Sequence, residues 1–585
     1  MSDRADWDIM RAENGAALAG LESGSRHVVL ISTGFPLDAK SRPPLSQLLQ
    51  LTTDSRQLIE ESVRVLEPDG LLFVHGLPQE LAVWGQALSA LRGESFELAF
   101  KYWIALDVDN APQGSGLKPT HLGLLLFTKA RPGSPGMLNL NTATVRVPHA
   151  FCTACGRNVK DWGGKKHLMN PIGTALSDIW RDLPRQVLND TIAPASVLDR
   201  VHALTARDKM RPLHVVQTER GVEPVSSATI PPTVSAPLSQ IAAEQMSVLA
   251  QDNVYHTDCV SFLSKTAGLH PQGVFDLAFA DPPYNLKKSY DTYADALAEQ
   301  HYIEWCEAWL EGMARTLKPG GALLVLNLPK WAVHHAAFLN RHLEFRNWIA
   351  WDALSDPRGK LMPAHYALLY YTKPGAPPVF NYTPPGAPGR SDAVSSPDSP
   401  QYCLRASCIK QRKASGDDRK VELTDVWFDI HRIKHKRDRD HHPCQLPEKL
   451  MERIIKLTTR PGDLVFDPFC GAGTTAIAAT RLGRHFVVTE MDENYVRITE
   501  EKLAAMRRNA DLFGELTVPR SSVTKPKRAA TKRDIELVLQ ELARGLGRVP
   551  EEHEVEAARP GLLGTIDQIY PNRSAAFKRA KVALV

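Results

Sequence analysis

The sequence predicts an α/β protein with a doubly wound Rossmann-like sheet, a second and degenerate α/β domain, and a small α-helical C-terminal domain. Two observations carry this prediction. Residues 462–483, GDLVFDPFCGAGTTAIAATRLG, have the pattern of an apolar strand, a glycine-containing turn and an alanine-rich helix, which is typical of a nucleotide-type site in a parallel sheet. In addition, two distant parts of the chain show one series of turns and buried strands in the same order.

The repeat consists of four matched segments. Each copy begins with a Pro-Gly or Pro-Asp-Gly turn after a helix, continues into a buried strand, and contains a later strand that closes on Thr-Lys. The first copy comprises 65–78, 101–107, 117–129 and 176–183, and the second comprises 316–329, 346–352, 361–373 and 423–430. Because four segments match in one order, we interpret the halves as copies of one fold rather than as coincidence.

Composition divides the chain further. A chain of 585 residues is several times the usual domain size, so more than one domain is expected. Residues 222–244 are rich in Pro, Ser and Thr, and residues 516–534 are basic, so both are interpreted as linkers. The expected domains are therefore 1–221, 245–515 and 535–585.

Several classes of protein are excluded by composition. Hydrophobic residues make up 43% of the chain and charged residues 23%, as in ordinary globular proteins, and no apolar run reaches the length of a membrane-spanning helix. The polar N-terminus lacks the pattern of a secretory signal. Eight scattered cysteines fit a reducing compartment, so we expect a cytoplasmic protein without a membrane partner. The net charge of +4 is too small to indicate nucleic-acid binding by itself.

The first candidate site lies in GVFDLAFADPPYNL. Asp281, Pro282, Pro283 and Tyr284 directly follow a short apolar strand, at the edge where open α/β sheets bind ligands. The Asp281 carboxylate and the Pro282 carbonyl can both accept hydrogen bonds from an amino group, and proline holds its carbonyl in a fixed direction. The Tyr284 ring can stack on a nucleobase. The alternative is a simple strand-ending turn, which Asp and Pro favour.

The second candidate site is the glycine turn DPFCGAGTT. Gly471 and Gly473 permit a tight turn and a close approach of the backbone to a ligand. A helix N-terminus near Thr474 can receive a carboxylate, and Asp467 can hold an ammonium group. Glu490 ends the next strand, where an acidic residue typically binds the hydroxyls of a ribose. The alternative for Glu490 is a surface carboxylate.

DPPY followed later by DPFCGAGTT resembles the beta-type, permuted amino-methylating DNA methyltransferases of the adenine N6 and cytosine N4 family, over about residues 250–505. The resemblance implies S-adenosylmethionine as the methyl donor and the four DPPY residues as the catalytic motif. The cofactor contacts that it implies are Asp258, Asp281, Gln445, Asp467, Phe469, Gly471, Gly473, Thr474 and Glu490. One departure is Leu446, which stands before Pro447 where the family often has lysine.

The same resemblance favours adenine N6 as the target, because the aspartate form of the catalytic motif is commoner in adenine enzymes and serine is frequent in cytosine N4 enzymes. Cytosine N4 remains the alternative. Protein glutamine methyltransferases look similar but usually begin this motif with asparagine, so Asp281 argues against them. A rival of another class is a non-catalytic DNA-binding or regulatory subunit whose methyltransferase folds are vestigial, and the two intact motifs oppose it.

Residues 330–440 lie where the family places its target-recognition region, so double-stranded DNA with a flipped base is the expected partner. Four basic side chains in IHRIKHKRDRDHH are the candidate phosphate contacts: Lys434, Lys436, Arg437 and Arg439. A solvated basic loop is the alternative. A restriction endonuclease partner is compatible with this activity, whereas the recognition sequence and the oligomeric state are not encoded in any motif.

The first half lacks the chemistry of the second. It has Thr33, Gly34 and Phe35 near the expected carboxylate, and no counterpart of DPFCGAG follows, so we interpret it as a silent, degenerate methyltransferase-like copy. It also contains a C-x-x-C pair, Cys152 and Cys155, which is half of a zinc site. The second half has two cysteines at the matching position with a different spacing, 403 and 408, so the sequence does not favour zinc.

The C-terminal tail has the pattern of a helix, a GRVP turn at 547–550, a short helix and an aromatic, basic helix. The turn and the stretch Ser574, Ala575, Ala576 and Phe577 resemble small repeats attached to homing endonucleases. That resemblance implies an accessory DNA-binding module, and a helical cap on the catalytic domain is the alternative.

Overall fold

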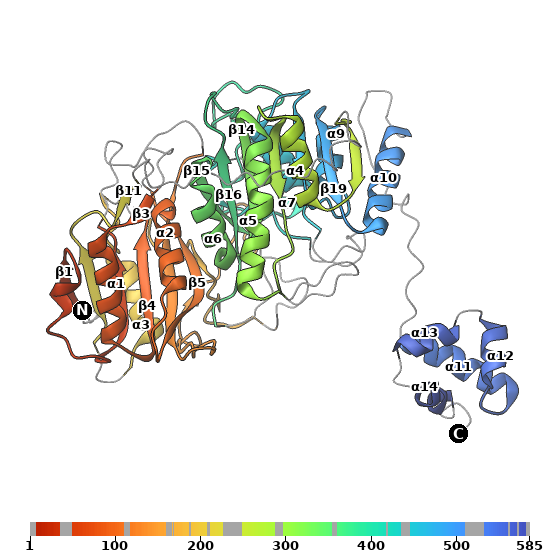
Figure 1. The fold of residues 1–585 in the computed structure, drawn as a ribbon, viewed down its shortest axis with the longest axis horizontal. Helices are drawn as coiled ribbons and strands as arrows, with labels where there is room; N and C mark the ends of the chain where they lie inside the picture. The colour runs from red at the N-terminus through yellow and green to blue at the C-terminus, as the bar shows by residue number, and fades with distance from the viewer. Residues whose placement is uncertain are drawn as a thin grey trace. The chain divides into compact units, whose positions relative to one another are not determined.

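The structure is a computed structural model of the chain and forms two compact units, Met1–Val518 and Pro519–Val585 (Figure 1). The residues that it describes are 7–34, 49–109, 117–159, 167, 169–185, 189–207, 211–225, 249–286, 297–353, 360–416, 419–433, 445–508, 532–559, 562–569 and 573–580. Among these, no helix is long and apolar enough to cross a membrane.

The first half of the larger unit contains a seven-stranded sheet. In spatial order its strands are β1 (Asp8–Ala12), β10 (Leu213–Gln217), β2 (Arg26–Ser32), β4 (Leu66–Gly76), β6 (His121–Ala130), β5 (Glu97–Asp107) and β9 (Ile179–Trp180). The first four strands are mutually parallel, whereas β6 pairs antiparallel with both β4 and β5. Short two-stranded sheets join β3 (Leu49–Leu51) to β11 (Val222–Pro224) and β7 (Arg146–Val147) to β8 (Thr174–Ala175).

The second half contains an eight-stranded sheet. Its spatial order is β12 (Asn253–His256), β19 (His485–Glu490), β18 (Leu464–Asp467), β13 (Phe275–Ala280), β14 (Leu317–Asn327), β16 (His365–Thr372), β15 (Glu344–Asp352) and β17 (Val426–Trp427). From β18 to β17 this order and these directions match those from β10 to β9 in the first sheet. The predicted α/β fold class is confirmed.

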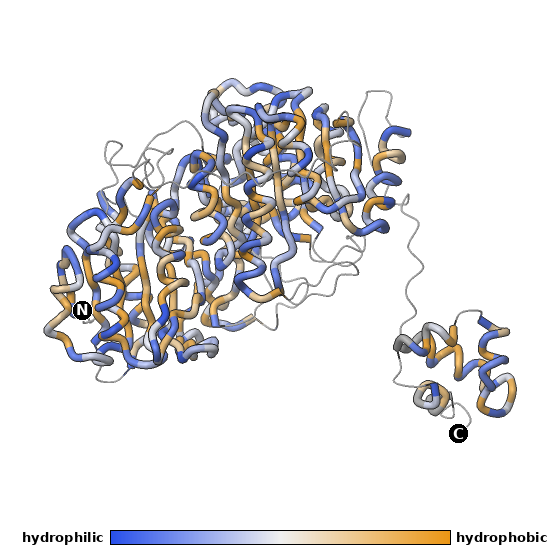
Figure 2. Tube along the Cα trace, in the orientation of Figure 1, coloured by the Kyte–Doolittle hydropathy of each residue, from blue (hydrophilic) through white to orange (hydrophobic). Residues whose placement is uncertain are grey.

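Helices cover both faces of each sheet, as expected for a doubly wound fold. On the first sheet, α1 (Thr53–Val65) and α2 (Pro78–Ala90) lie on one face and α3 (Ala195–Thr205) on the other. On the second, one face carries α4 (Cys259–Leu269), α5 (Glu299–Thr316) and α6 (Pro329–Leu339), and the other α8 (Glu448–Thr458), α9 (Thr474–Arg481) and α10 (Glu493–Arg508). Hydrophobic residues follow the central strands and hydrophilic residues the outer turns (Figure 2).

The Pro-Gly turns lie elsewhere than expected. Instead of separating helix from strand, they fall inside β4 and β14, which begin directly after α1 and α5. In the second half the pairing of β13 with β14 begins at Leu317, skips the turn and resumes at Ala322. In the first half β2 pairs with Leu66 and then with Leu71 in the same way. The turn is therefore a bulge within the strand, and both halves contain it.

The two halves contact each other through a reciprocal exchange of buried carboxylates. Asp178 of the first half accepts hydrogen bonds from the backbone N–H groups of Ala364 (2.7 Å) and His365 (3.0 Å) in the second. In return, Asp425 of the second half accepts from the backbone N–H of Thr120 at 2.7 Å in the first. Both aspartates are nearly inaccessible to solvent, at 3% and 2% exposure, so their hydrogen bonds are shielded from water.

Aromatic packing continues this pseudo-symmetric interface. The indole rings of Trp103 in β5 and Trp348 in β15 stack with centroids 3.8 Å apart, and both are buried. One hydrophobic core includes side chains of α1 and α2 as well as α5 and α6, so it crosses from one half into the other. The halves therefore fold against each other as one body.

The smaller unit is helical, with α11 (Lys532–Leu546), α12 (Glu552–Ala558), α13 (Leu562–Ile569) and α14 (Arg573–Ala580). Ile535 and Leu539 of α11 pack with Val555, Ile566 and Ala576 from the other three helices. The sequence pattern predicts three helices here; the structure has α11, the short α12 and the basic α14 in that order, and α13 between α12 and α14 is a helix that the sequence analysis missed.

Removal of either exchanged carboxylate should destabilise the larger unit. Asp178→Ala leaves two buried N–H groups without an acceptor, so the free energy of unfolding should fall by about 3 kcal/mol. Asp425→Ala should have an effect of the same kind. Urea-induced unfolding measures both, and Asp199→Ala, at an exposed position of α3, is the matched control. Equal stability of the Asp178 and Asp199 variants would contradict the assigned role.

Candidate active site

Three acidic residues stand at the carboxyl ends of three neighbouring parallel strands. Asp281 follows β13, Asp467 ends β18 and Glu490 ends β19. Because the strands are parallel, these ends meet at one edge of the sheet, where they line a single pocket. The other predicted residues that line this pocket are Asp258, Pro282, Pro283, Tyr284, Gln445, Phe469, Gly471 and Thr474.

Hydrogen bonds to the backbone carbonyls hold the DPPY loop in place. The Tyr302 hydroxyl of α5 donates to the carbonyl of Pro283 at 2.7 Å, and the Trp331 indole of α6 donates to the carbonyl of Tyr284 at 2.9 Å. The Tyr302 hydroxyl itself accepts a hydrogen bond from Asn327 at 3.2 Å. These donors come from two helices and a strand, so the loop conformation is determined by the core beneath it.

Within the loop, the Tyr284 hydroxyl donates to Oδ1 of Asp281 at 2.5 Å. The tyrosine ring is only 8% exposed and lies 5.9 Å from the ring of Tyr366, measured between centroids. Asp281 and Tyr284 are therefore oriented by each other as well as by the backbone.

The glycine turn has the conformation that the sequence predicts. Gly471 and Gly473 have φ angles of 51° and 86°, in the left-handed region. A Cβ atom on Gly473 would lie 2.7 Å from Cγ2 of Thr499, so a larger residue would be excluded by space as well as by backbone conformation. The helix α9 begins at Thr474, as expected, and its first two residues, Thr474 and Thr475, line the pocket.

Asp467 is a buried carboxylate within this turn, with 3% of its surface exposed. It accepts hydrogen bonds from the Thr475 hydroxyl at 2.5 Å and from the Phe469 N–H at 2.8 Å. Burial raises its pKa to about 7, although these two hydrogen bonds favour the charged form, and the nearby Glu490 carboxylate raises it further. A cation in the pocket would restore full ionisation.

Glu490 connects the two strand-end loops. Its carboxylate accepts hydrogen bonds from the backbone N–H groups of Gly471 (2.8 Å), Met491 (2.9 Å) and Asp492 (2.9 Å). Burial raises its pKa, and these three N–H groups act against that shift. Asp258 has a comparable place beside the pocket, where it caps α4 by accepting from the Ser261 N–H at 2.8 Å.

The groups that line this pocket suit S-adenosylmethionine. An adenosyl amino acid offers an ammonium group, ribose hydroxyls and a flat base, and the pocket offers buried carboxylates, a helix N-terminus and aromatic side chains. When bound, this cofactor supplies an electrophilic methyl group. The residues therefore fit the cofactor that the sequence predicts.

Sequence reasoning missed several residues of this region. Trp305, Met491, Asp492 and Tyr495 also line the pocket. Met491 and Asp492 could have been predicted, because they directly follow Glu490 in the chain. No motif near Trp305 in the sequence indicates that it lines the pocket. Tyr302 and Trp331, which hold the DPPY loop, could not be identified from the sequence either, because each is a single aromatic residue in an apolar helix.

The predicted phosphate contacts, Leu446 and the cysteine pairs remain to be placed in the structure. The candidate phosphate contacts Lys434, Lys436, Arg437 and Arg439 lie outside the described residues. The departure from the family pattern, Leu446, lines the pocket beside Gln445. The sequence interpretation of an incomplete zinc ligand set is wrong, because the fold brings the pairs 152/155 and 403/408 together despite their unequal spacing.

The end of β2 in the first half, which corresponds to the end of β13, has different surroundings among the residues that the structure describes. Its strand β2 ends at Ser32, whose hydroxyl bonds with His214 at 2.9 Å, and Thr33 and Gly34 follow. A Cβ on Gly34 would lie 1.9 Å from the carbonyl oxygen of Gln217, which ends β10. Gly34 thus packs directly onto the end of β10, at the position that corresponds to the pocket of the second half. Phe35 lies outside the described residues.

Comparisons with known proteins identify the family to which this region is similar. Residues 275–501 match the sequence profile of the N6/N4 DNA methylase family. The chain is 35% identical over 269 residues to the type II methyltransferase M.BamHI of Bacillus amyloliquefaciens, an alignment that covers 45% of this chain and 59% of that protein. It is 28% identical over 258 residues to the DNA adenine methyltransferase YhdJ of Escherichia coli strain K12, covering 43% and 82%.

A third relative is the type II methyltransferase M.HpaI of Haemophilus parainfluenzae, with 30% identity over 233 residues, 39% of this chain and 68% of that protein. The chain thus spans 59% of M.BamHI and more than two thirds of M.HpaI and YhdJ. The matched region contains both the DPPY loop and the glycine turn. On the profile match and the extent of these alignments, the chain belongs to the N6/N4 DNA methylase family.

Proposed function

We propose that this protein transfers a methyl group from S-adenosylmethionine to the N6 atom of adenine in DNA. The observation that carries the proposal is the shared pocket of Asp281 and Asp467, which places an acceptor for an amino group beside an acceptor for a cofactor ammonium. Aspartate in the DPPY motif supports adenine over cytosine N4, as does the similarity to the DNA adenine methyltransferase YhdJ.

The exocyclic amine of adenine is a poor nucleophile, because its lone pair is delocalised into the ring. In this proposal the Asp281 carboxylate and the Pro282 carbonyl accept the two amino hydrogens and stabilise the positive charge that grows on nitrogen. The DPPY loop is already oriented by Tyr302 and Trp331, so little reorganisation is needed when a base arrives. A target base must leave the duplex to reach this pocket, and the Tyr284 ring is its proposed stacking partner.

No general base is required for this reaction. The amine becomes acidic only after it has gained the methyl group, and its proton can then pass to Asp281 or to water. The principal task of the site is to hold the nitrogen in line with the donor methyl group. Proline at 282 and 283 and the hydrogen bond from Tyr284 to Asp281 serve that purpose.

The cofactor roles follow from the charges around the pocket. Asp467 is proposed to bind the ammonium group, and the N-terminus of α9 at Thr474 the carboxylate. Glu490 is proposed to accept from the ribose hydroxyls and Asp258 to lie near the adenine. Gln445 and Phe469 line the same pocket and are proposed as further cofactor contacts, together with the glycine turn at Gly471 and Gly473.

The target-recognition region is proposed at about residues 330–440, with the basic side chains at 434, 436, 437 and 439 as phosphate contacts. The first half is proposed to be catalytically silent, since the described residues that follow β2, Thr33 and Gly34, include no carboxylate and Gly34 packs against the end of β10. The first half is proposed to take the place of a partner subunit, because it exchanges reciprocal hydrogen bonds with the second half. The type II relatives also support a proposed endonuclease with the same recognition sequence.

Asp281→Ala should lower the rate of methyl transfer by at least about a thousandfold while cofactor affinity is retained, because the lost acceptor acts on the amine. We would sequence DNA from cells that express the protein with a method that distinguishes N6-methyladenine from N4-methylcytosine. Asp199→Ala is the matched control, and a modified motif present with it and absent with Asp281→Ala is expected.

The same measurement separates the alternatives. N4-methylcytosine in the motif would replace the proposed target base while the assigned catalytic residue stands. Cofactor binding without modification of any DNA would favour the non-catalytic subunit. A near-normal rate for Asp281→Ala would refute the catalytic role.

Cofactor binding should weaken as Asp467 becomes protonated. Its folded pKa is raised to about 7, so a lower pH removes the charge that attracts the ammonium group. The dissociation constant for S-adenosylmethionine should rise about eightfold between about pH 7.5 and pH 6. Isothermal calorimetry measures this constant, and Asp467→Asn should bind more weakly with a flatter pH profile. An unchanged profile in that variant would exclude Asp467 as the titrating group.

A further inference from the structure

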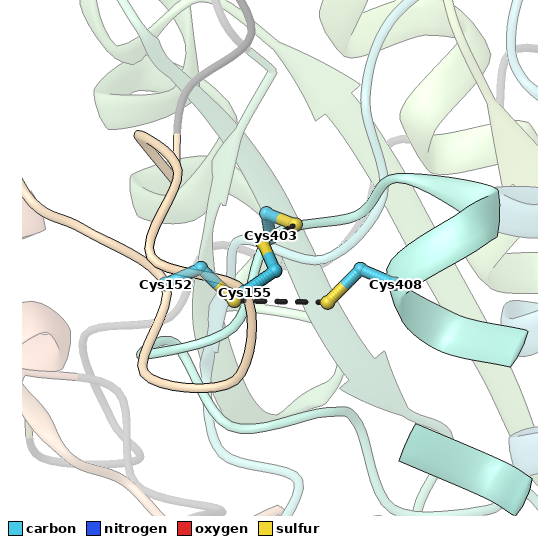
Figure 3. A group of neighbouring side chains, drawn as sticks. All are labelled: Cys152, Cys155, Cys403 and Cys408. Atoms are coloured by element: carbon cyan, nitrogen blue, oxygen red, sulfur yellow. Dashed lines mark hydrogen bonds between the residues drawn. The ribbon is translucent and has the colours of Figure 1, made fainter. Parts of the chain in front are cut away.

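Four cysteine side chains from distant parts of the chain converge at one point outside the proposed active site. The Sγ atoms of Cys152, Cys155, Cys403 and Cys408 all lie within 4.8 Å of one another (Figure 3). The Sγ atoms of Cys152 and Cys408 are 3.8 Å apart, and those of Cys155 and Cys403 are 3.7 Å apart. Three of the side chains are buried, with Cys155 partly exposed.

These distances fit one metal ion. Zinc bound by four thiolates has Zn–S bonds of about 2.3 Å in a tetrahedron, so neighbouring sulfur atoms are separated by about 3.8 Å. A disulfide has a much shorter S–S distance of about 2.05 Å. The sulfur atoms therefore have the separation expected of ligands around a common centre rather than of two disulfide bonds.

The surrounding backbone holds the two cysteine pairs against each other. The loop that contains Cys152 and Cys155 belongs to the first half, and its Thr153 N–H donates to the carbonyl of Gln401 in the second half at 3.2 Å. In the opposite direction, Arg405 donates to the carbonyl of Asn158 at 2.7 Å. The four ligands are thus positioned by contacts that do not involve sulfur.

A buried positive charge accompanies the cluster. Arg412, with 1% of its surface exposed, lies in α7 (Ala406–Ser415) one turn after Cys408. Its guanidinium donates to the Cys408 sulfur at 3.2 Å and to the Cys403 carbonyl at 3.3 Å, and it pairs with Asp398 at 2.8 Å. Four thiolates around a divalent ion have a net charge of −2, which a neighbouring arginine stabilises.

We propose that the four cysteines bind one structural Zn²⁺ ion. Thiolates are the ligands that zinc favours in closed tetrahedral sites, and all four positions are filled by protein, so the ion has no open position for substrate. The site connects the loop at 151–158 of the first half with residues 402–412 of the second, inside the proposed target-recognition region. Zinc would therefore fix that region on the silent half independently of the methylation chemistry.

The first test is metal content. The untagged full-length protein, dialysed against EDTA, should contain one zinc ion per chain by inductively coupled plasma mass spectrometry. Cys155→Ser and Cys403→Ser should each lose the ion, whereas Cys306→Ser, at a buried cysteine of α5, should retain it. Absence of stoichiometric metal from the wild-type protein, or iron in place of zinc, would overturn the assignment.

The second test uses the wild-type chain and does not depend on the folding of a variant. Replacement of the ion by Co²⁺ should produce the visible absorption of tetrahedral cobalt and a sulfur-to-cobalt charge-transfer band. Limited proteolysis after removal of the ion should cut faster within 151–158 and 402–416 than in the metal-bound protein. A cobalt spectrum without thiolate bands, or equal cleavage rates in both forms, would overturn the proposal.

Discussion

The exchange of buried carboxylates between Asp178 and Asp425 is the constraint on which the rest of the larger unit depends. Each aspartate satisfies backbone N–H groups of the opposite half, so neither half can bury this edge of its sheet without the other. His365, which donates to Asp178, opens β16, and β16 belongs to the same sheet as β13, the strand that Asp281 follows. The first half therefore contributes to the support of the half that carries the proposed active site.

Two sheets with the same strand order have different chemistry at their carboxyl ends. In the second half, β13 and β18 end in aspartates that face a pocket, and in the first half, Gly34 packs directly onto Gln217. The fold alone does not produce an active site, since the side chains at the strand ends and the space between them decide it. The second half has carboxylates and a pocket at these strand ends, and the first half packs against the second.

Most of the proposed site could be predicted from the sequence, because its residues are local to strand ends. Asp281, Asp467 and Glu490 each follow an apolar run, and the position of a residue at the end of a parallel strand is enough to place it at the ligand edge. Tyr302 and Trp331 could not be predicted in the same way. Their hydrogen bonds to the DPPY carbonyls arise only when α5 and α6 pack on the sheet.

The duplicated α/β fold and the two motifs could be predicted from the sequence, because periodicity and turn residues act over a few neighbouring positions. Which distant groups meet depends instead on tertiary packing. Cys152 and Cys408 are separated by 256 positions, and their unequal spacing patterns give no local sign of a common site. They converge because two sheets pack through a shared interface, and the spacing of residues along a chain carries no information about that packing.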